Sequence, residues 1–139
     1  MDIASIFVQA AERYPNHTAL IFENRRWTYA QWSARVRRFA EGLARLGVRP
    51  SDRVAFYVTT SENSVTTYFA CQMLGAVAVP LNFRLAWGEA AYVLQDSGAR
   101  VLVYGRYLTP NVLEVQKRKA PTVQSLCLPP GAAKPGKCA

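Results

Sequence analysis

The sequence predicts an α/β protein with a layered, mainly parallel sheet and helices on both faces. Short apolar strands alternate with helices of ten or more residues, as in chains whose parallel strands are joined by right-handed crossovers. These strands are almost continuously apolar, which is expected where both faces of a sheet are covered. The 139 residues are 50% hydrophobic and 19% charged, so the chain can bury a core and is not compositionally disordered.

The first half of the chain is expected to form a helix, a hairpin and a second, longer helix. The first helix begins at Ile3 and is stopped by Pro15. In the longer helix, apolar residues step by four, three, four and three and so form a stripe along one face. Thr28 is its expected N-terminal cap, and Gly47 ends it in a left-handed conformation. The expected ranges are 19–22 and 26–29 for the hairpin strands and about 30–46 for the long helix.

The second half has the alternating pattern that defines the fold class. Ser61 precedes a helix that Gly75 closes, and Pro80 is expected to end the strand that follows. Thr109 and Pro110 are expected to cap and open the last helix, which must end before Pro121. The expected strands are 53–58, 77–79, 101–104 and 123–128, and the other helices are about 62–74 and 88–95.

The chain divides at residue 128. Residues 1–128 form the expected folded unit, whereas 129–139 are rich in proline and glycine and predict a disordered tail. This tail contains a string resembling a nucleotide-binding P-loop, from Gly131 to Gly136-Lys137-Cys138. No helix can follow the lysine before the chain ends at Ala139, and Cys138 stands where magnesium requires a hydroxyl, so we reject this interpretation.

Charge and composition restrict the partners. Lys and Arg number 17 against 9 Asp and Glu, a formal charge of +8, which favours anionic partners. The three cysteines form no CxxC pair, and the single histidine, His17, leaves neither a zinc cluster nor a histidine-based triad. There is no basic segment before an apolar core at the N-terminus, and no apolar stretch long enough to span a bilayer. These features predict a cytoplasmic protein without a transmembrane segment.

An arginine cluster is the most prominent polar feature. A nucleic-acid site would need such residues beside exposed aromatics, but Trp32 and Phe39 belong to the apolar stripe. We therefore interpret the cluster as a solvated helix face and expect no specific nucleic-acid binding. Its members are Arg25, Arg26, Arg35, Arg37, Arg38, Arg45, Arg49 and Arg53.

Three further positions are candidates for functional residues. The segment Thr59-Thr60-Ser61 lies between a strand and a helix, where α/β proteins bind anions, but ordinary capping explains Ser61. Cys71 is interpreted as a small core residue and His17 as exposed and idle. We therefore assign no catalytic, cofactor-binding or metal-binding residue.

Residues 27–103 carry a family resemblance in the order and spacing of their motifs. The marks are Thr28-Tyr29, Leu46-Gly47-Val48, Asp52-Arg53-Val54-Ala55, Gly75-Ala76-Val77, Pro80-Leu81-Asn82, Arg84-Leu85, and Glu89 with Asp96-Ser97. Together they resemble the N-terminal part of the AMP-forming acyl-CoA synthetases, the adenylate-forming superfamily. The opening helix and the hairpin also fit, so that the resemblance covers about residues 3–128.

The resemblance implies ATP- and magnesium-dependent activation of a carboxylate to an acyl-adenylate, followed by transfer to coenzyme A. It places the phosphate loop with its lysine, the other nucleotide-binding motifs and the C-terminal lysine further along the family's chain. ATP, magnesium and coenzyme A are therefore implied for the complete enzyme and not for this fragment. The positions that match are packing and turn positions.

We therefore interpret the chain as a truncated acyl-CoA synthetase-like protein that is not expected to be active alone. Its expected partner is the missing remainder of a synthetase or, without that remainder, a second copy. The alternative is a non-catalytic interaction or anion-binding module that uses the basic face or a sheet edge.

Overall fold

The central element is a parallel four-stranded sheet, seen in a computed structural model that describes residues 2–118 and 123–128. The strand order is β4-β3-β5-β6, and each neighbouring pair is parallel. The strands are β3 (Arg53–Tyr57), β4 (Val77–Leu81), β5 (Val101–Gly105) and β6 (Gln124–Leu128). The predicted fold class is confirmed.

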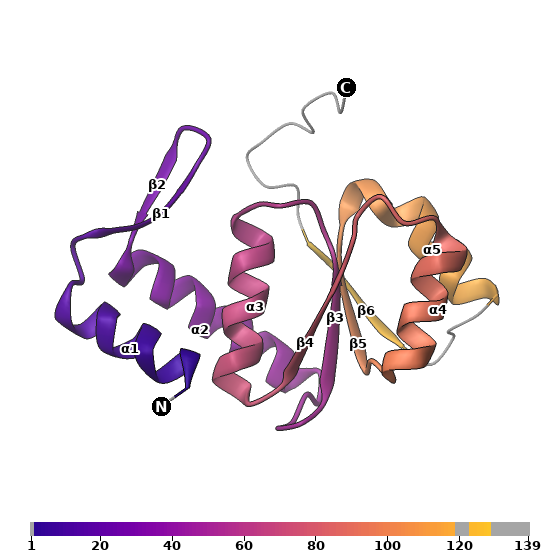
Figure 1. The fold of residues 1–139 in the computed structure, drawn as a ribbon, viewed down its shortest axis with the longest axis horizontal. Helices are drawn as coiled ribbons and strands as arrows, with labels where there is room; N and C mark the ends of the chain where they lie inside the picture. Colours follow the sequence, from indigo (N-terminus) through magenta and orange to yellow (C-terminus); the bar gives the residue numbers. More distant parts are fainter. Residues whose placement is uncertain (1, 119–122, 129–139) are drawn as a thin grey trace.

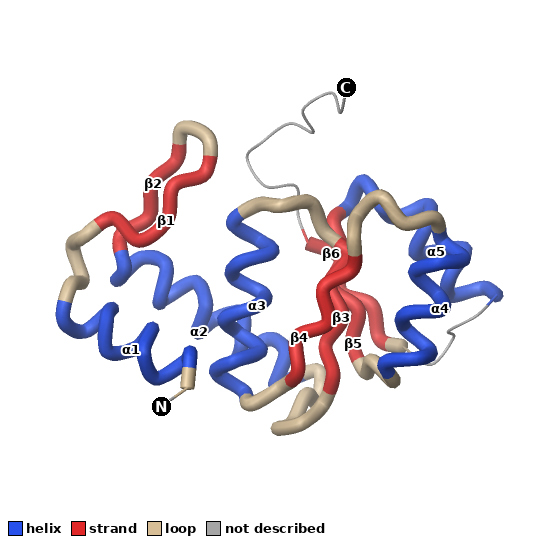
Figure 2. The backbone as a smooth tube through the Cα atoms, in the orientation of Figure 1, coloured by secondary structure: helices blue, strands red, loops and turns tan. Residues whose placement is uncertain are grey.

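Helices cover both faces of this sheet (Figures 1 and 2). On one face lie α1 (Ile3–Arg13), α2 (Tyr29–Arg45) and α3 (Glu62–Leu74), and on the other α4 (Trp87–Ser97) and α5 (Thr109–Arg118). Alternate strand residues therefore enter two different cores. Val54 and Phe56 pack with the α2 and α3 side, whereas Ala55 and Tyr57 pack with the α4 and α5 side.

Three aromatic rings join the helices of the first face. Phe7 of α1 lies 4.8 Å from Trp32 of α2, between ring centroids, and each of them lies 4.9 Å from Phe69 of α3. The rings meet at steep angles, which is the arrangement that aromatic quadrupoles favour. This cluster fixes α1 onto α2 and α3.

The hairpin consists of β1 (Thr18–Phe22) and β2 (Arg25–Thr28), and it projects beyond the N-terminal end of α2 (Figure 1). Glu23 supplies the positive φ, 52°, that the turn needs in the absence of glycine. Thr28 caps α2 as expected, since its hydroxyl accepts a hydrogen bond from the Gln31 amide while the Gln31 side chain accepts one from the Thr28 amide.

Two local predictions were wrong. Pro80 does not end its strand, because β4 runs on to Leu81 and Pro80 stays in register with Phe56. A proline is tolerated there because β4 is an edge strand of the described sheet. Thr109 is not an N-cap: its φ and ψ of −50° and −44° are helical, and a 3-10 turn, Arg106–Leu108, precedes it.

Residues 129–139, including the P-loop-like string, lie outside the described residues. Within the part that is described, no helix is long and apolar enough to cross a membrane.

Substitutions at Gly75 and Gly42 compare a glycine at a helix end with a glycine inside a helix. Gly75 caps α3 with φ 66°, so Gly75→Ala should destabilise the fold by about 1 kcal/mol. Gly42 lies within α2 and has open space where the Cβ of an alanine would be, so Gly42→Ala should stabilise the fold by about 0.5–1 kcal/mol. Urea unfolding monitored by circular dichroism measures both changes, and equal effects of the two substitutions would contradict the assignment.

Candidate functional site

The strand order creates a topological switch point between β3 and β5, the place where open α/β sheets usually bind ligands. The chain moves from β3 outward to β4, and from β5 outward to β6 on the other side. Thr59 follows β3 and Tyr107 follows β5, and the Thr59 amide donates a hydrogen bond to the Tyr107 hydroxyl. A protein side chain therefore already uses this donor at the switch point.

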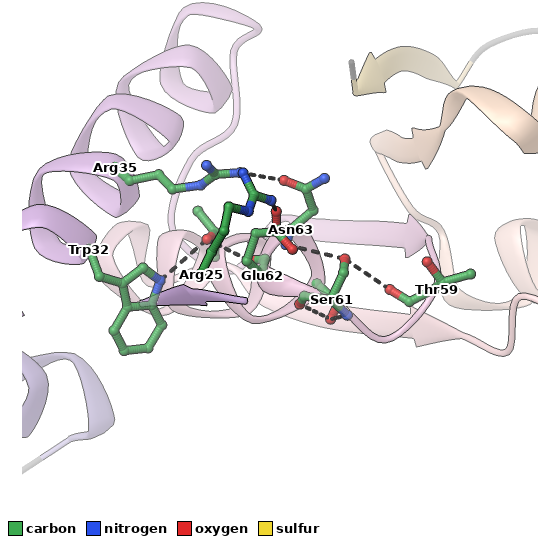
Figure 3. Close-up of polar contacts among 9 residues, drawn as sticks. Arg25, Trp32, Arg35, Thr59, Ser61, Glu62 and Asn63 are labelled. Atoms are coloured by element: carbon green, nitrogen blue, oxygen red, sulfur yellow. Dashed lines mark hydrogen bonds and ion pairs between the residues drawn. The ribbon is translucent and has the colours of Figure 1, made fainter. Parts of the chain in front are cut away.

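The polar groups of Ser61, which follows β3, are used by the helix cap (Figure 3). The Ser61 hydroxyl accepts from the Asn63 amide at 3.3 Å, and the Ser61 amide donates to the Ser64 hydroxyl at 3.1 Å. The Ser61 hydroxyl also donates to the Thr59 carbonyl at 3.2 Å. The capping interpretation of Ser61 is confirmed.

Among the described residues, neither a buried polar side chain nor a cluster of metal ligands marks a nucleotide, magnesium or coenzyme A site. Every buried side-chain nitrogen and oxygen atom among them has a hydrogen-bond partner, so none is left pointing at an absent ligand. Within the same residues, no group of three or more His, Cys, Asp or Glu side chains could hold a metal ion. No step of the implied chemistry can be assigned to these side chains.

A buried carboxylate at the start of α3 is the most unusual polar group of the structure. Glu62 is only 2% exposed, and its carboxylate is paired with the guanidinium of Arg25, which is 37% exposed and comes from β2 (Figure 3). The first turn of a helix also favours a negative charge. The ion pair thus attaches the projecting hairpin to α3, across 37 positions of sequence.

Arg35 of α2 extends toward the same helix end and hydrogen-bonds the Asn63 side chain (Figure 3). The guanidinium carbons of Arg25 and Arg35 lie 4.8 and 5.9 Å from the ring centroid of Trp27. Burial lowers the pKa of Arg35 from its ordinary value; the charges of Arg25 and Arg38 lower it further, while Glu62 opposes them. Arg25 and Arg35 are therefore partly buried and bonded to α3. The interpretation of the cluster as a solvated helix face was wrong for these two residues.

A third link joins α2 to α3 beneath the two arginines. The Trp32 indole nitrogen donates to the Thr66 hydroxyl at 3.3 Å, and that hydroxyl donates to the Glu62 carbonyl at 2.6 Å. Trp32 is buried, as its place in the apolar stripe predicted. The indole is therefore a packing residue with a satisfied donor.

The outer side of this cluster is an open groove of about 590 Å³ between the hairpin and α2, which we call the arginine groove. Its basic residues come from β2 and α2, and Trp27 is the aromatic residue of its lining. The lining residues are Arg25, Arg26, Trp27, Gln31, Ala34, Arg35 and Arg38. The sequence showed these arginines but not that the hairpin and the helix bring them to one groove.

The other two candidate positions are Cys71 and His17. Cys71 is fully buried in the core, and burial raises the pKa of its thiol to about 12, so the core interpretation is confirmed. His17 is exposed, and its ring stacks on Tyr14 with the centroids 5.2 Å apart.

Loss of the Arg25 partner should lower the stability of the fold, because burial of the Glu62 carboxylate is then no longer compensated. Arg25→Gln leaves the buried Glu62 carboxylate without its ion-pair partner, which should destabilise the fold by about 2 kcal/mol, less than for a fully buried pair because Arg25 is partly exposed. The exposed neighbour is the control, and Arg26→Gln should change stability by less than about 0.5 kcal/mol. Denaturant unfolding should also show that adding Glu62→Gln to Arg25→Gln restores part of the lost stability. Equal stability of Arg25→Gln and Arg26→Gln would contradict the role of the ion pair.

The two described cysteines should differ sharply in reactivity. At neutral pH the raised pKa and the burial keep Cys71 as an inaccessible thiol, whereas Cys127 is exposed. Brief treatment with iodoacetamide, followed by peptide mass spectrometry, should show alkylation of Cys127 in the native protein and of Cys71 only in urea. Alkylation of native Cys71 at the rate of Cys127 would show that the core around it is open.

The curated relatives of this chain are CoA ligases. A feruloyl-CoA synthase of an Amycolatopsis species is 46% identical over 97 residues, which are 70% of this chain and 20% of that protein. A crotonobetaine/carnitine–CoA ligase of Salmonella paratyphi A is 32% identical over 132 residues, 91% of this chain and 26% of that protein. The chain thus spans about a fifth to a quarter of the length of these relatives.

Solved structures of the same kind share the fold. A fatty acyl CoA synthetase of Mycobacterium tuberculosis has a TM-score of 0.86 and 33% identity, over 91% of this chain and 26% of that one. The N-terminal domain of FACL13 from the same organism also has a TM-score of 0.86, with 32% identity, over 91% of this chain and 34% of that one. The family model described as AMP-binding enzyme matches residues 7–137. This chain therefore belongs to the AMP-binding enzyme family, and the acyl-CoA synthetase resemblance noted in its sequence is confirmed.

Proposed function

We propose that this chain is the N-terminal part of a cytoplasmic CoA ligase that activates a carboxylate with ATP and transfers the acyl group to coenzyme A. The observation that carries the proposal is the match of residues 7–137 to the AMP-binding enzyme model, together with the likeness to the N-terminal domain of FACL13. The comparisons give no support to the alternative of a non-catalytic module, because the relatives are ligases.

Catalysis is proposed for the complete ligase and not for this chain alone. The Thr59 amide and the amide and hydroxyl of Ser61 at the switch point are already paired within the protein, and the described residues offer no unpaired buried side-chain donor. Stabilisation of the charge that develops on a transferring phosphate is usually the largest catalytic contribution, and it requires such donors. In the proposal, the described residues form the scaffold on which the remainder of the ligase is placed.

The carboxylate substrate is proposed only as a class. The names of the relatives refer to feruloyl, crotonobetaine or carnitine, and long-chain fatty acyl substrates, which differ widely in size and polarity. What these names share is a carboxylate joined to coenzyme A.

The remainder of the ligase is the proposed partner of the exposed sheet edges. β4 and β6 are the outer strands of the described sheet, and their outer backbone groups can pair with another strand. Without that remainder, a second copy of this chain is the proposed alternative partner.

A chimeric enzyme tests the proposal directly. Residues 3–128 of this chain replace the equivalent N-terminal segment of the M. tuberculosis long-chain-fatty-acid–CoA ligase, which is 38% identical over 96 residues. The chimera should form acyl-CoA in an ATP-dependent reaction, whereas the 139-residue chain alone should show no carboxylate-dependent pyrophosphate exchange.

The matched control is the same chimera with Val54→Asp, which places a carboxylate in the core strand β3 and should abolish activity by unfolding the segment. A chimera that melts cooperatively and binds ATP but forms no acyl-CoA would contradict the proposal. Pyrophosphate exchange by the chain alone would contradict the assignment of catalysis to the remainder.

A further inference from the structure

We propose that the arginine groove binds a phosphate-bearing anion, held by Arg26, Arg35 and Arg38 beside the Trp27 ring. Neither the family match nor the names of the relatives assign a ligand to this place. The inference rests on the groove itself and does not depend on the proposed ligase activity.

The groove carries an uncompensated positive charge. Four of its lining residues are arginines, and Glu62 pairs with one of them, Arg25, which leaves three. Among the described residues, no other carboxylate forms an ion pair with a groove arginine. Glu62 attracts the half-buried Arg35, while Arg25 and Arg38 repel it. An anion between these groups would relieve that repulsion, whereas in its absence the cations destabilise one another.

The guanidinium groups deepest in the groove are already held in place. Glu62 fixes Arg25, and the Asn63 side chain fixes Arg35, so both are oriented by the first turn of α3 (Figure 3). Groups that are held before a ligand arrives lose little side-chain entropy when it binds. Arg26 and Arg38 are exposed, and neither side chain forms a hydrogen bond or ion pair with the described residues, so both are available to bind an anion from the hairpin and from α2.

The chemistry of the groove favours phosphate. Guanidinium groups donate paired hydrogen bonds whose fork matches the oxygens of phosphate, and three positive charges suit an anion with more than one negative charge. The volume of about 590 Å³ lies in the usual range for small-molecule sites and exceeds what a single phosphate fills. Trp27 offers apolar surface for an attached organic group. A soluble organic phosphate and a phospholipid headgroup share this chemistry.

Titration of the 139-residue chain with tripolyphosphate tests the binding. Isothermal titration calorimetry in low-salt buffer should show saturable binding. The double variant Arg26→Gln/Arg38→Gln should raise the dissociation constant about tenfold or more, because even one lost charged hydrogen bond corresponds to about that factor. Neither side chain is bonded to another described residue, so the fold should be kept, which circular dichroism checks.

The control is Arg49→Gln/Arg106→Gln, which removes the same charge from exposed positions outside the groove and should leave the dissociation constant within about twofold. Co-sedimentation with phosphatidylglycerol vesicles distinguishes the two sources of phosphate. Vesicle binding that tripolyphosphate displaces and that Arg26→Gln/Arg38→Gln weakens indicates a phospholipid headgroup. Binding of tripolyphosphate without binding to vesicles indicates a soluble ligand. Equal weakening in both double variants, or no saturable binding of either probe, would overturn the proposal.

Discussion

The N-terminal half of this protein depends on one buried carboxylate, that of Glu62 at the first position of α3. A carboxylate that is 2% exposed is costly unless a cation and hydrogen bonds compensate it, and the pairing cation comes from the hairpin. Beneath the ion pair, the Glu62 carbonyl accepts a hydrogen bond from the Thr66 hydroxyl, which in turn accepts one from the Trp32 indole nitrogen. The hairpin, α2 and α3 therefore meet at one helix end, and the arginine groove is the outer surface of that meeting point.

The sheet side of the molecule has a different character. Its two cores are formed by alternating residues of the central strands β3 and β5. After β3, the Thr59 amide pairs with Tyr107, and Ser61 caps α3. These groups of the crevice, which serves as a ligand site in other α/β proteins, are therefore used within the protein, whereas the exposed arginines lie in the arginine groove.

The sequence predicted the fold because periodicity and capping residues act locally. The apolar stripe of α2, the Thr28 and Ser61 caps and the left-handed Gly47 and Gly75 are all properties of short segments. Pro80 misled because its tolerance depends on lying at a sheet edge, and Thr109 misled because a 3-10 turn precedes it. The site was less predictable, since the Arg25–Glu62 pair joins residues 37 apart and no local pattern links them. The family resemblance was recognised from the order of short motifs. Motif order indicates common ancestry but does not predict which side chains contact one another.

The central claim, that Glu62 joins the hairpin to the rest of the fold, is tested most directly by native-state hydrogen exchange of the β1 and β2 amides. In the wild-type protein, the cross-strand amides of the hairpin should exchange with an opening free energy close to that of β3, because opening the hairpin breaks the ion pair and also removes Leu20 and Trp27 from the core against which they pack. In Glu62→Gln, the hairpin amides should lose protection while those of β3 and β5 keep most of theirs. Hairpin amides that exchange far faster than β3 in the wild-type protein, or that are unaffected by Glu62→Gln, would contradict the claim.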